Sequence, residues 1–249
     1  MARMRKKKNI PQRMDACSDF WFSVPVANRG KWRKACGMPE SAPLYLEIGC
    51  GKGDFSCQMA ELHPEICFLA LEKDESVILA AIEKAHEKDL ENLFFLQTDA
   101  QFLRNYFDQG EIDRIFINFC DPWIRKNKTK RRLTYRDFLS IYKDLLSEKG
   151  QIHFKTDEPA LFAFSIEEFW DCDLYLDKVT LNLHRSKWNS ANIQTEFEKK
   201  FSSEGLPIYR FEGHMSVDSC IDPLLDFPEE LEDFRGNDKK SSVEGKSGS

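Results

Sequence analysis

Four carboxylates each stand at the end of an apolar run in this sequence: Glu47, Glu72, Asp99 and Asp121. The first precedes a glycine-rich stretch, "LEIGCGKGDF", whose glycines are Gly49, Gly51 and Gly53. Glycine allows a tight turn and the close approach of a ligand to the backbone. Acids at one rim would repel a pyrophosphate, but they suit a ligand that carries an ammonium, a sulfonium, ribose hydroxyls and an exocyclic amine. S-adenosylmethionine carries all four, so the pattern predicts a site for this cofactor.

A strongly basic loop follows the last of these acids, in "CDPWIRKNKTKRRLT". Between Arg125 and Arg132 it carries six basic residues and no acidic one, although the formal net charge of the chain is −6. A solvated surface loop is the ordinary explanation of such a run. A folded RNA is the functional one, because its phosphates must be neutralised where a base enters the site. We therefore expect a polyanionic partner.

Alternating apolar strands and amphipathic helices must position these groups. Strands are expected at 44–49, 66–72, 92–100, 112–119, 151–157, 174–184 and 206–213. Helices are expected at 55–63, 75–89, 135–150 and 158–170, and the third should end at Gly150. This alternation implies parallel strands joined by right-handed crossovers. The predicted fold class is α/β, a doubly wound, mostly parallel sheet flanked by helices, which binds ligands at the carboxyl ends of its strands.

Three regions are expected along the 249 residues. Residues 1–40 should form a basic N-terminal arm that ends in a short packed segment around "DFWFSVP". The cations of "RMRKKK" in this arm are either a general phosphate binder or a solubilising device. Residues 41–213 should form the α/β domain, and residues 214–249 an acidic tail that we expect to be disordered.

Composition narrows the class of protein further. The eight cysteines form no C-x-x-C pair and do not cluster with histidines, so no metal site is expected. No run of about 18 apolar residues exists, and no apolar stretch follows the basic N-terminus. We therefore expect no membrane span and no secretory signal, and interpret the chain as cytoplasmic, either a monomer or a homodimer.

Several motifs, in their order and spacing, resemble those of the bacterial tRNA (guanine-N7-)-methyltransferases from about Leu44 to Glu212. They are "EIGCGKGDF", "INFCDPW", "KRRLT", "FKTDE", "TEFEKKF" and "PIYR". The combination of "DPW", the basic "KRRLT" and the late "TEFE" is the specific feature. The resemblance implies the Rossmann-like fold of class I S-adenosylmethionine-dependent methyltransferases. It also implies methylation of tRNA at N7 of the guanosine at position 46, in the variable loop.

The resemblance further implies roles for individual residues. The four strand-end acids would contact the cofactor together with the glycine loop, and Asp121 would also lie in the catalytic loop. The substrate-contacting positions would be Arg125, Asn127, Lys128, Thr129, Lys130, Arg131, Arg132, Asp157, Thr195, Glu196, Phe197 and Glu198.

Two residues depart from the usual D-P-W-P-K of that family. Ile124 stands where the family has a second proline, so this loop is expected to be less rigid. Arg125 stands where the family has lysine, which keeps the charge but exchanges a point donor for a planar fork. We do not expect this exchange to inactivate the enzyme.

Some of these positions have an ordinary structural explanation as well. Asp157 could select guanine by accepting hydrogen bonds from N1–H and N2–H₂, or it could cap the helix that follows. Asp99 could likewise be a helix cap. "TEFE" could be a helix start with a threonine cap and acids near the positive end of the helix.

Three other functions fit parts of the pattern. An amino-group methyltransferase acting on another nucleic acid or on a protein is one, because Asp-Pro-aromatic loops also serve amine targets. A catalytically idle RNA-binding relative is another, although the intact acids and the Asp-Pro-Trp argue against it. A dehydrogenase is disfavoured because the dinucleotide pattern G-x-G-x-x-G is missing.

Overall fold

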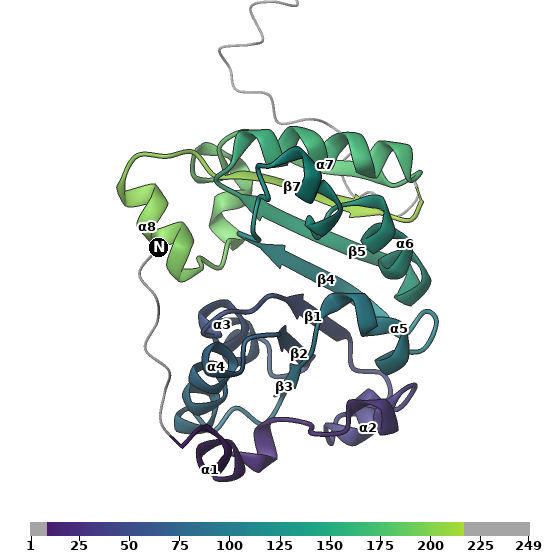
Figure 1. Cartoon of the computed structure of the whole chain (residues 1–249), viewed down its shortest axis with the longest axis vertical. Helices are drawn as coiled ribbons and strands as arrows, with labels where there is room; N and C mark the ends of the chain where they lie inside the picture. Colours follow the sequence, from purple (N-terminus) through teal and green to yellow (C-terminus); the bar gives the residue numbers. More distant parts are fainter. Residues whose placement is uncertain (1–8, 217–249) are drawn as a thin grey trace, which may run out of the picture.

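The computed structural model describes residues 9–216, and residues 1–8 and 217–249 lie outside that description. Its centre is a seven-stranded sheet with the order β3-β2-β1-β4-β5-β7-β6 (Figure 1). The strands are β1 (Leu44–Ile48), β2 (Cys67–Glu72), β3 (Leu93–Gln97), β4 (Ile112–Asn118), β5 (Leu146–Thr156), β6 (Tyr175–Thr180) and β7 (Tyr209–His214). The first five pair in parallel, and β7 runs antiparallel between β5 and β6. The predicted doubly wound, mostly parallel sheet is confirmed.

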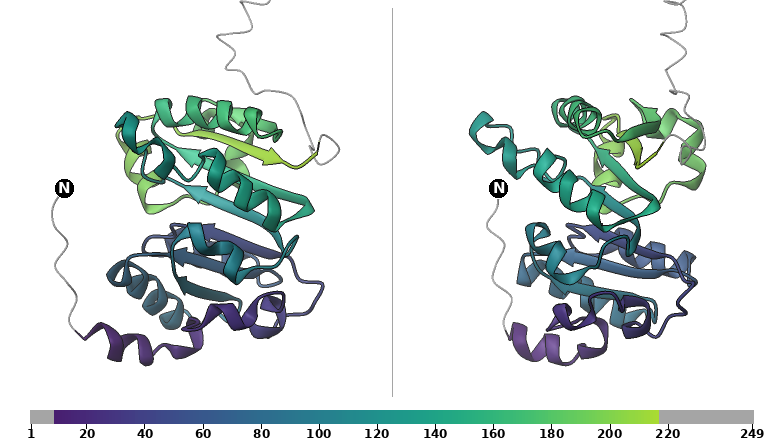
Figure 2. Two further views of the ribbon diagram at one scale, coloured as in Figure 1. Left: turned by 45° about the vertical axis from the view of Figure 1, so that its right-hand side comes forward. Right: turned by 90° about the vertical axis from the view of Figure 1, so that its right-hand side faces the viewer.

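Helices cover both faces of this sheet (Figure 2). On one face α3 (Asp54–Leu62) and α4 (Glu75–Glu87) share a core with Phe68, Phe95 and Phe116. On the other face α5 (Leu103–Tyr106), α6 (Arg136–Leu145) and α7 (Pro159–Asp171) share a core with Ile115 and Phe154. Successive strand residues point to opposite faces, so Phe116 and Ile115 belong to different cores. Both faces are apolar here, as a sheet that is covered on both sides requires.

The N-terminal segment packs over a longer stretch than "DFWFSVP". It contains α1 (Ile10–Asp15), η1 (Ser18–Phe20), η2 (Pro25–Asn28) and α2 (Trp32–Ala35), and it runs along the β3 edge of the sheet (Figure 1). Phe22 N donates to Phe95 O at 3.1 Å, which pairs this segment with the edge strand. Trp32 is fully buried, and its Nε1 donates to Tyr106 O at 2.8 Å.

The expectation that the third helix ends at Gly150 is wrong. α6 ends at Leu145, and β5 begins at Leu146, which pairs with Ile112 of β4. Regular pairing resumes only at Gln151, so Ser147 to Gly150 form an irregular step in the strand. A Cβ on Gly150 would lie 2.8 Å from the Cβ of Leu146, so glycine is required by this close fold of the chain and not by a helix end.

Two further sequence expectations concern the ends and the surroundings of the chain. β7 extends to His214, one residue past the expected domain boundary, and most of the expected acidic tail lies outside the described residues. Within residues 9–216, every helix is too short or too polar to cross a membrane.

Candidate active site

The glycine-rich loop joins β1 to α3 and leaves space above two of its glycines. Gly49 and Gly51 have φ angles of 79° and 58°, and a Cβ on either would meet nothing within 4 Å. A Cβ on Gly53 would instead lie 2.7 Å from the Cβ of Ala81 in α4. The first two glycines therefore offer bare backbone to a ligand, whereas Gly53 is required where α3 packs on α4.

Glu72 and Asp99 stand at neighbouring strand ends, after β2 and β3. Glu72 accepts hydrogen bonds from the backbone N of Gly51 at 3.3 Å and of Lys73 at 2.8 Å. Asp99 accepts from Gln101 N at 3.1 Å, so the capping interpretation of Asp99 is correct. Both carboxylates are partly exposed and keep lone pairs for a ligand.

Glu47 lies beneath the loop and is only 2% exposed. One of its oxygens accepts from Ser56 Oγ of α3, and the other accepts from Asn118 Nδ2 of β4 at 3.0 Å. Burial raises the pKa of Glu47, although these hydrogen bonds and the charge of Lys155 oppose the rise. The carboxylate thus ties β1, α3 and β4 together directly below the glycine loop.

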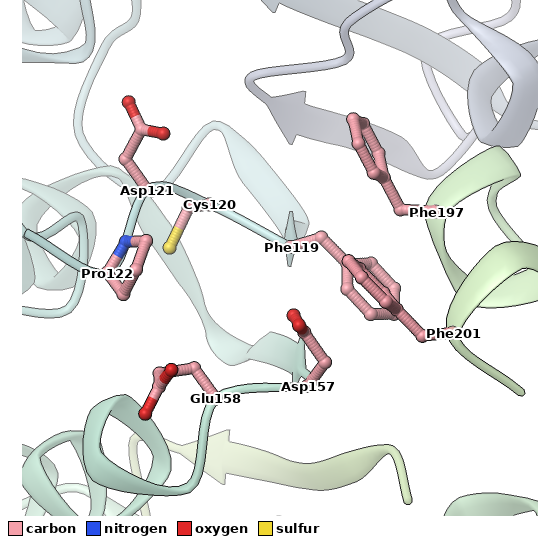
Figure 3. A pocket seen from close by; sticks show the side chains of 8 residues that line it. All are labelled: Phe119, Cys120, Asp121, Pro122, Asp157, Glu158, Phe197 and Phe201. Atoms are coloured by element: carbon pink, nitrogen blue, oxygen red, sulfur yellow. The ribbon is translucent and has the colours of Figure 1, made fainter. Parts of the chain in front are cut away.

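A cavity of about 220 Å³ lies at the ends of β4 and β5. We call it the edge cavity; its lining residues are Phe119, Cys120, Asp121, Pro122, Asp157, Glu158, Phe197 and Phe201. Figure 3 shows Asp121 and Pro122 on one side and Phe197 and Phe201, from α8 (Glu196–Ser203), on the other. Asp157 points between the two sides from the end of β5. Three segments that are distant in sequence therefore meet at this site.

Three aromatic rings form one wall of the edge cavity. The ring centres of Phe119 and Phe201 are 6.1 Å apart, and those of Phe197 and Phe201 are 6.3 Å apart with planes inclined by 21°. Phe197 is 55% exposed. An exposed ring beside two acids offers a flat surface on which a nucleobase can stack.

The chain around Asp121 adopts uncommon backbone conformations. Phe119 and Trp123, which flank it, have φ angles of 52° and 42°, a left-handed region that residues other than glycine rarely occupy. Such strain persists where the surroundings impose it, and it gathers at functional sites. Burial, with the adjacent Asp121 adding, raises the pKa of the Cys120 thiol to about 12, so this thiol stays neutral.

The basic loop forms η4 (Lys126–Arg131) and divides its side chains into two groups. Arg132 Nε donates to Pro122 O at 2.9 Å, and its guanidinium lies 4.3 Å from the ring centre of Phe164. Arg131 lies 5.0 Å from the ring centre of Trp123. The other side chains are exposed or half-buried: Arg125, Lys126, Asn127, Lys128, Thr129 and Lys130. Arg132 therefore supports the Asp121 loop, while the side chains from Arg125 to Lys130 remain at least partly exposed.

Glu158, and not Asp157, caps α7. Its Oε1 accepts from Ala160 N at 3.3 Å, so the capping interpretation of Asp157 is wrong. The Asp157 side chain points into the edge cavity instead. Partial burial raises the pKa of Asp157, and the neighbouring charge of Glu158 adds to the rise.

Of the four predicted substrate-contacting residues at the start of α8, two are buried and two are exposed. Thr195 Oγ1 accepts from Glu198 N at 2.9 Å, which is the predicted threonine cap. Glu198 is fully buried and accepts from Lys155 Nζ at 2.7 Å. Glu196 is exposed and lies 3.2 Å from Lys52 Nζ of the glycine loop, so α8 reaches back over that loop.

One group of potential metal ligands occurs within residues 9–216, although the sequence predicts no metal site. Ligand atoms of Asp177, Glu212 and His214 lie within 4.8 Å of one another, and all three residues are buried. Lys178 Nζ donates to Glu212 at 2.7 Å, and Arg210 donates to the same carboxylate. Cations of the protein already neutralise this group, so we assign no ion to it.

Comparison with known proteins gives the family. A family model described as "Putative methyltransferase" matches residues 41–211. The tRNA (guanine-N(7)-)-methyltransferase of Halalkalibacterium halodurans is 46% identical over 209 residues, which cover 83% of this chain and 94% of that protein. The chain belongs to the tRNA (guanine-N(7)-)-methyltransferase family. Another member, from Listeria monocytogenes, is 43% identical over 85% of this chain and 97% of its own length.

Solved structures support the fold of this family member. The 16S rRNA methyltransferase KamB matches with a TM-score of 0.57 at 13% identity, over 75% of this chain and 93% of that chain. A structure described as an antibiotic-related methyltransferase matches with a TM-score of 0.55 at 15% identity, over 85% of this chain and 96% of that chain. At such low identity these similarities show the class I methyltransferase fold alone.

Sequence reasoning missed several residues of the site. Phe119 and Phe201 line the edge cavity, and Asn118 holds Glu47. Phe201 follows Phe197 by one helical turn, a spacing that predicts two rings on one side of α8. The sequence holds no comparable signal for Asn118, because its contact with Glu47 depends on the register of β4 beside β1.

Proposed function

We propose that this chain transfers a methyl group from S-adenosylmethionine to N7 of a guanosine in tRNA, at position 46 in the variable loop. Membership of the family supports the reaction and the class of RNA. The observation that carries the proposal is that Asp121, Asp157 and Phe197, from three separate segments, line one cavity at the carboxyl edge of the sheet. Open α/β sheets bind their ligands at this edge.

The reaction depends on aligning guanine N7 with the methyl donor more than on proton transfer. Guanine N7 carries a lone pair and no proton, so no general base has to remove one. S-adenosylmethionine supplies, when bound, an electrophilic methyl group on a positively charged sulfur. Holding the guanine in line with that group can lower the barrier by roughly 7–11 kcal/mol in favourable cases. A carboxylate beside the path, Asp121, would stabilise positive charge as it appears on the purine.

The ends of β1, β2 and β3 fit this cofactor. Gly49 and Gly51 leave the backbone open, and a ligand can approach them closely. Glu72 and Asp99 offer acceptors to ribose hydroxyls and to an exocyclic amine. Glu47 contributes a buried carboxylate from beneath, and Gly53 lets the loop lie close to α4.

The basic loop and α8 are the proposed RNA-contacting surfaces. The proposed contacts in the loop are the exposed Arg125, Asn127, Lys130 and Arg131 and the half-buried Lys128 and Thr129. On α8, Phe197 is exposed at the edge cavity and its neighbour Glu196 is exposed towards Lys52, while Thr195 and Glu198 keep the helix in place. Arg132 supports RNA binding by holding the loop. In the centre, Asp157 would accept from N1–H and N2–H₂ of guanine, which adenine cannot offer.

Incubation with labelled S-adenosylmethionine and unmodified tRNA, followed by nucleoside analysis, tests the proposal. The expected product is 7-methylguanosine, which is a fixed cation. A neutral N6- or N2-methylated base would establish the amino-group methyltransferase instead. Binding of tRNA without any label transfer would establish an idle RNA-binding relative.

Asp121→Asn tests the central residue. The substitution removes the negative charge beside the migrating cation, so we expect turnover on tRNA to fall about 10²-fold or more. Binding of S-adenosylhomocysteine, measured by calorimetry, shows whether the variant still folds. Asp144→Asn is the matched control, because Asp144 is exposed and pairs only with Arg104 of α5 among the contacts seen. Full turnover by Asp121→Asn would show that the charge of Asp121 does not stabilise the transition state.

We also propose that the enzyme works in the cytoplasm, as a monomer or a homodimer. A cytoplasmic place follows from its tRNA substrate. Light scattering of the full chain at micromolar concentration would give its oligomeric state.

A further inference from the structure

A second cavity, of about 340 Å³, lies on the face of the sheet that carries α3. We call it the face cavity. It is bounded by α3, by β4, β5 and β7, and by η6 (Lys187–Ala191) with the residues that follow it. Its lining shares no residue with that of the edge cavity. Its volume lies at the lower end of the range of about 300–1,000 Å³ that small-molecule sites occupy.

Cations outnumber acids in this lining, although the chain as a whole is acidic. Lys155 is matched by the buried Glu198 at 2.7 Å. Glu212 can neutralise only one of the two cations that contact it, Lys178 and Arg210. Arg114 adds a further positive charge, so the side chains that line the cavity carry more positive than negative charge, with the buried Asp177 and Glu47 behind them. Such a lining attracts an anion.

Arg114 carries one buried donor that the protein leaves unused. Its Nε is buried and has no hydrogen-bond partner, and its guanidinium lies 4.7 Å from the ring centre of Tyr45. A buried donor without an acceptor is destabilising, and a phosphate or carboxylate would supply the missing acceptor. Burial together with Arg114, Arg210 and Lys178 lowers the pKa of His153 well below its usual range, so this ring stays neutral beside them.

The opposite end of the same strand carries an unused acceptor. Asn118 is 8% exposed, its Nδ2 donates to Glu47, and its Oδ1 has no partner. Arg114 and Asn118 lie on one face of β4, four residues apart, which corresponds to about 13 Å along a strand. A single phosphate cannot span that distance. A ligand with an anion at one end and an N–H donor at the other can.

A β-bulge brings one of the excess cations into this cavity. Asp177 and Lys178 are consecutive in β6 and should point to opposite faces. Instead Asp177 bonds to His214 at 2.9 Å and Lys178 to Glu212 at 2.7 Å, and these two partners lie two residues apart on one face of β7. The register of β6 shifts at this point, and Lys178 has a φ of 46°. Bulges and backbone strain of this kind are found more often than average at functional sites.

Aromatic side chains complete the lining. Phe116 lies on β4 between Arg114 and Asn118, and Trp188 of η6 lies on the rim. Arg210 lies 5.9 Å from the ring centre of Trp188. Flat apolar surfaces between an anion site and an acceptor suit a planar ring.

We propose that the face cavity binds a nucleoside 5′-monophosphate whose base carries an amino group. Its phosphate pairs with Arg114 and with the cation that Glu212 leaves in excess. Its base lies against Phe116 and Trp188, and its amino group donates to Asn118 Oδ1. The site is separate from the one that performs methyl transfer, so its ligand can bind while the edge cavity is in use.

Calorimetric titration of the full chain with 5′-AMP tests the proposal. Saturating S-adenosylhomocysteine is present throughout, because adenosine groups could otherwise enter the cofactor site. We expect one site for 5′-AMP, and affinities about tenfold or more weaker for adenosine, which lacks the phosphate, and for ribose 5-phosphate, which lacks the base. Equal affinity for 5′-AMP and adenosine would overturn the phosphate assignment and with it the proposal.

Substitutions locate the binding. Arg114→Gln should abolish the advantage of 5′-AMP over adenosine, whereas Arg104→Gln, which removes an exposed arginine of α5, should leave it unchanged. Should Arg114→Gln fail to fold, Trp188→Leu on the rim provides the second variant. Trp188→Leu should weaken the binding of 5′-AMP but not that of ribose 5-phosphate. Unchanged 5′-AMP affinity in a folded Arg114→Gln, or an equal loss in Arg104→Gln, would place the ligand elsewhere and refute the site.

Discussion

The loop from Asp121 to Arg132 and the first turn of α8 face the same cavity, but they hold their charges in opposite ways. Most cations of the loop are exposed and remain available to a polyanion. In α8 the central charge, Glu198, is fully buried and matched by Lys155, whose side chain is 7% exposed. Charge that must meet a ligand therefore stays at the surface, and charge that must fix a helix is buried with its partner.

The largest expected effect separates these two uses of charge. Lys155→Met leaves Glu198 buried without its cation, which should lower the free energy of unfolding by about 3–5 kcal/mol. Urea denaturation measures the loss. The double variant Lys155→Met/Glu198→Leu should recover much of it, because the buried charge is then gone.

The exposed pair between Lys52 and Glu196 is the matched control. These side chains are 51% and 57% exposed, so Lys52→Met should cost only about 0–1 kcal/mol. An equal loss in Lys52→Met and Lys155→Met would show that burial does not distinguish the two pairs.

The exposed charges in this comparison could be predicted from the sequence, but the buried ion pair could not. Strand-end acids follow from apolar runs, and the parallel order of strands brings them to one edge without any knowledge of side-chain contacts. The partner of Glu198 cannot be inferred in this way, because Lys155 lies 43 residues away and meets it only through the packing of α8 on β5. The prediction of a helix end at Gly150 failed for a similar reason. The local pattern favours a helix end there, but the pairing of Leu146 with Ile112 overrides it.

The next effect lies within the loop itself. Arg132→Lys keeps the charge but cannot reproduce the planar donor that reaches Pro122 O and the stacking on Phe164. We expect kcat on tRNA to fall about 10-fold or more, because the Asp121 loop loses its support. The Km for tRNA should change little. A rise in Km at constant kcat would instead make Arg132 a phosphate contact like its neighbours.

An exposed cation of the loop should behave differently. Lys130 makes no ion pair among the described residues and is solvent-facing. Lys130→Gln should weaken tRNA binding at low salt and make the slope of log K against log salt shallower by about 1. Filter binding at several salt concentrations gives the slope. An unchanged slope would mean that Lys130 contacts no phosphate.

The smallest expected effect concerns the pH dependence that Asp157 imposes. Its carboxylate must be ionised to accept from guanine N1–H and N2–H₂, and partial burial raises its pKa above the ordinary value of about 3.9. As pH falls through the raised pKa, the carboxylate takes up a proton and kcat/KM for tRNA should decline, earlier than an ordinary aspartate would cause. Asp157→Asn should remove this acid limb and relax the choice of guanine over adenine. Glu158→Gln, which alters the adjacent cap and keeps an acceptor for Ala160 N, should do neither. If both variants retained the acid limb, the titrating group would lie outside this pair, and base selection would have to be sought on α8, where Phe197 lines the same cavity and Glu196 is exposed next to it in the sequence.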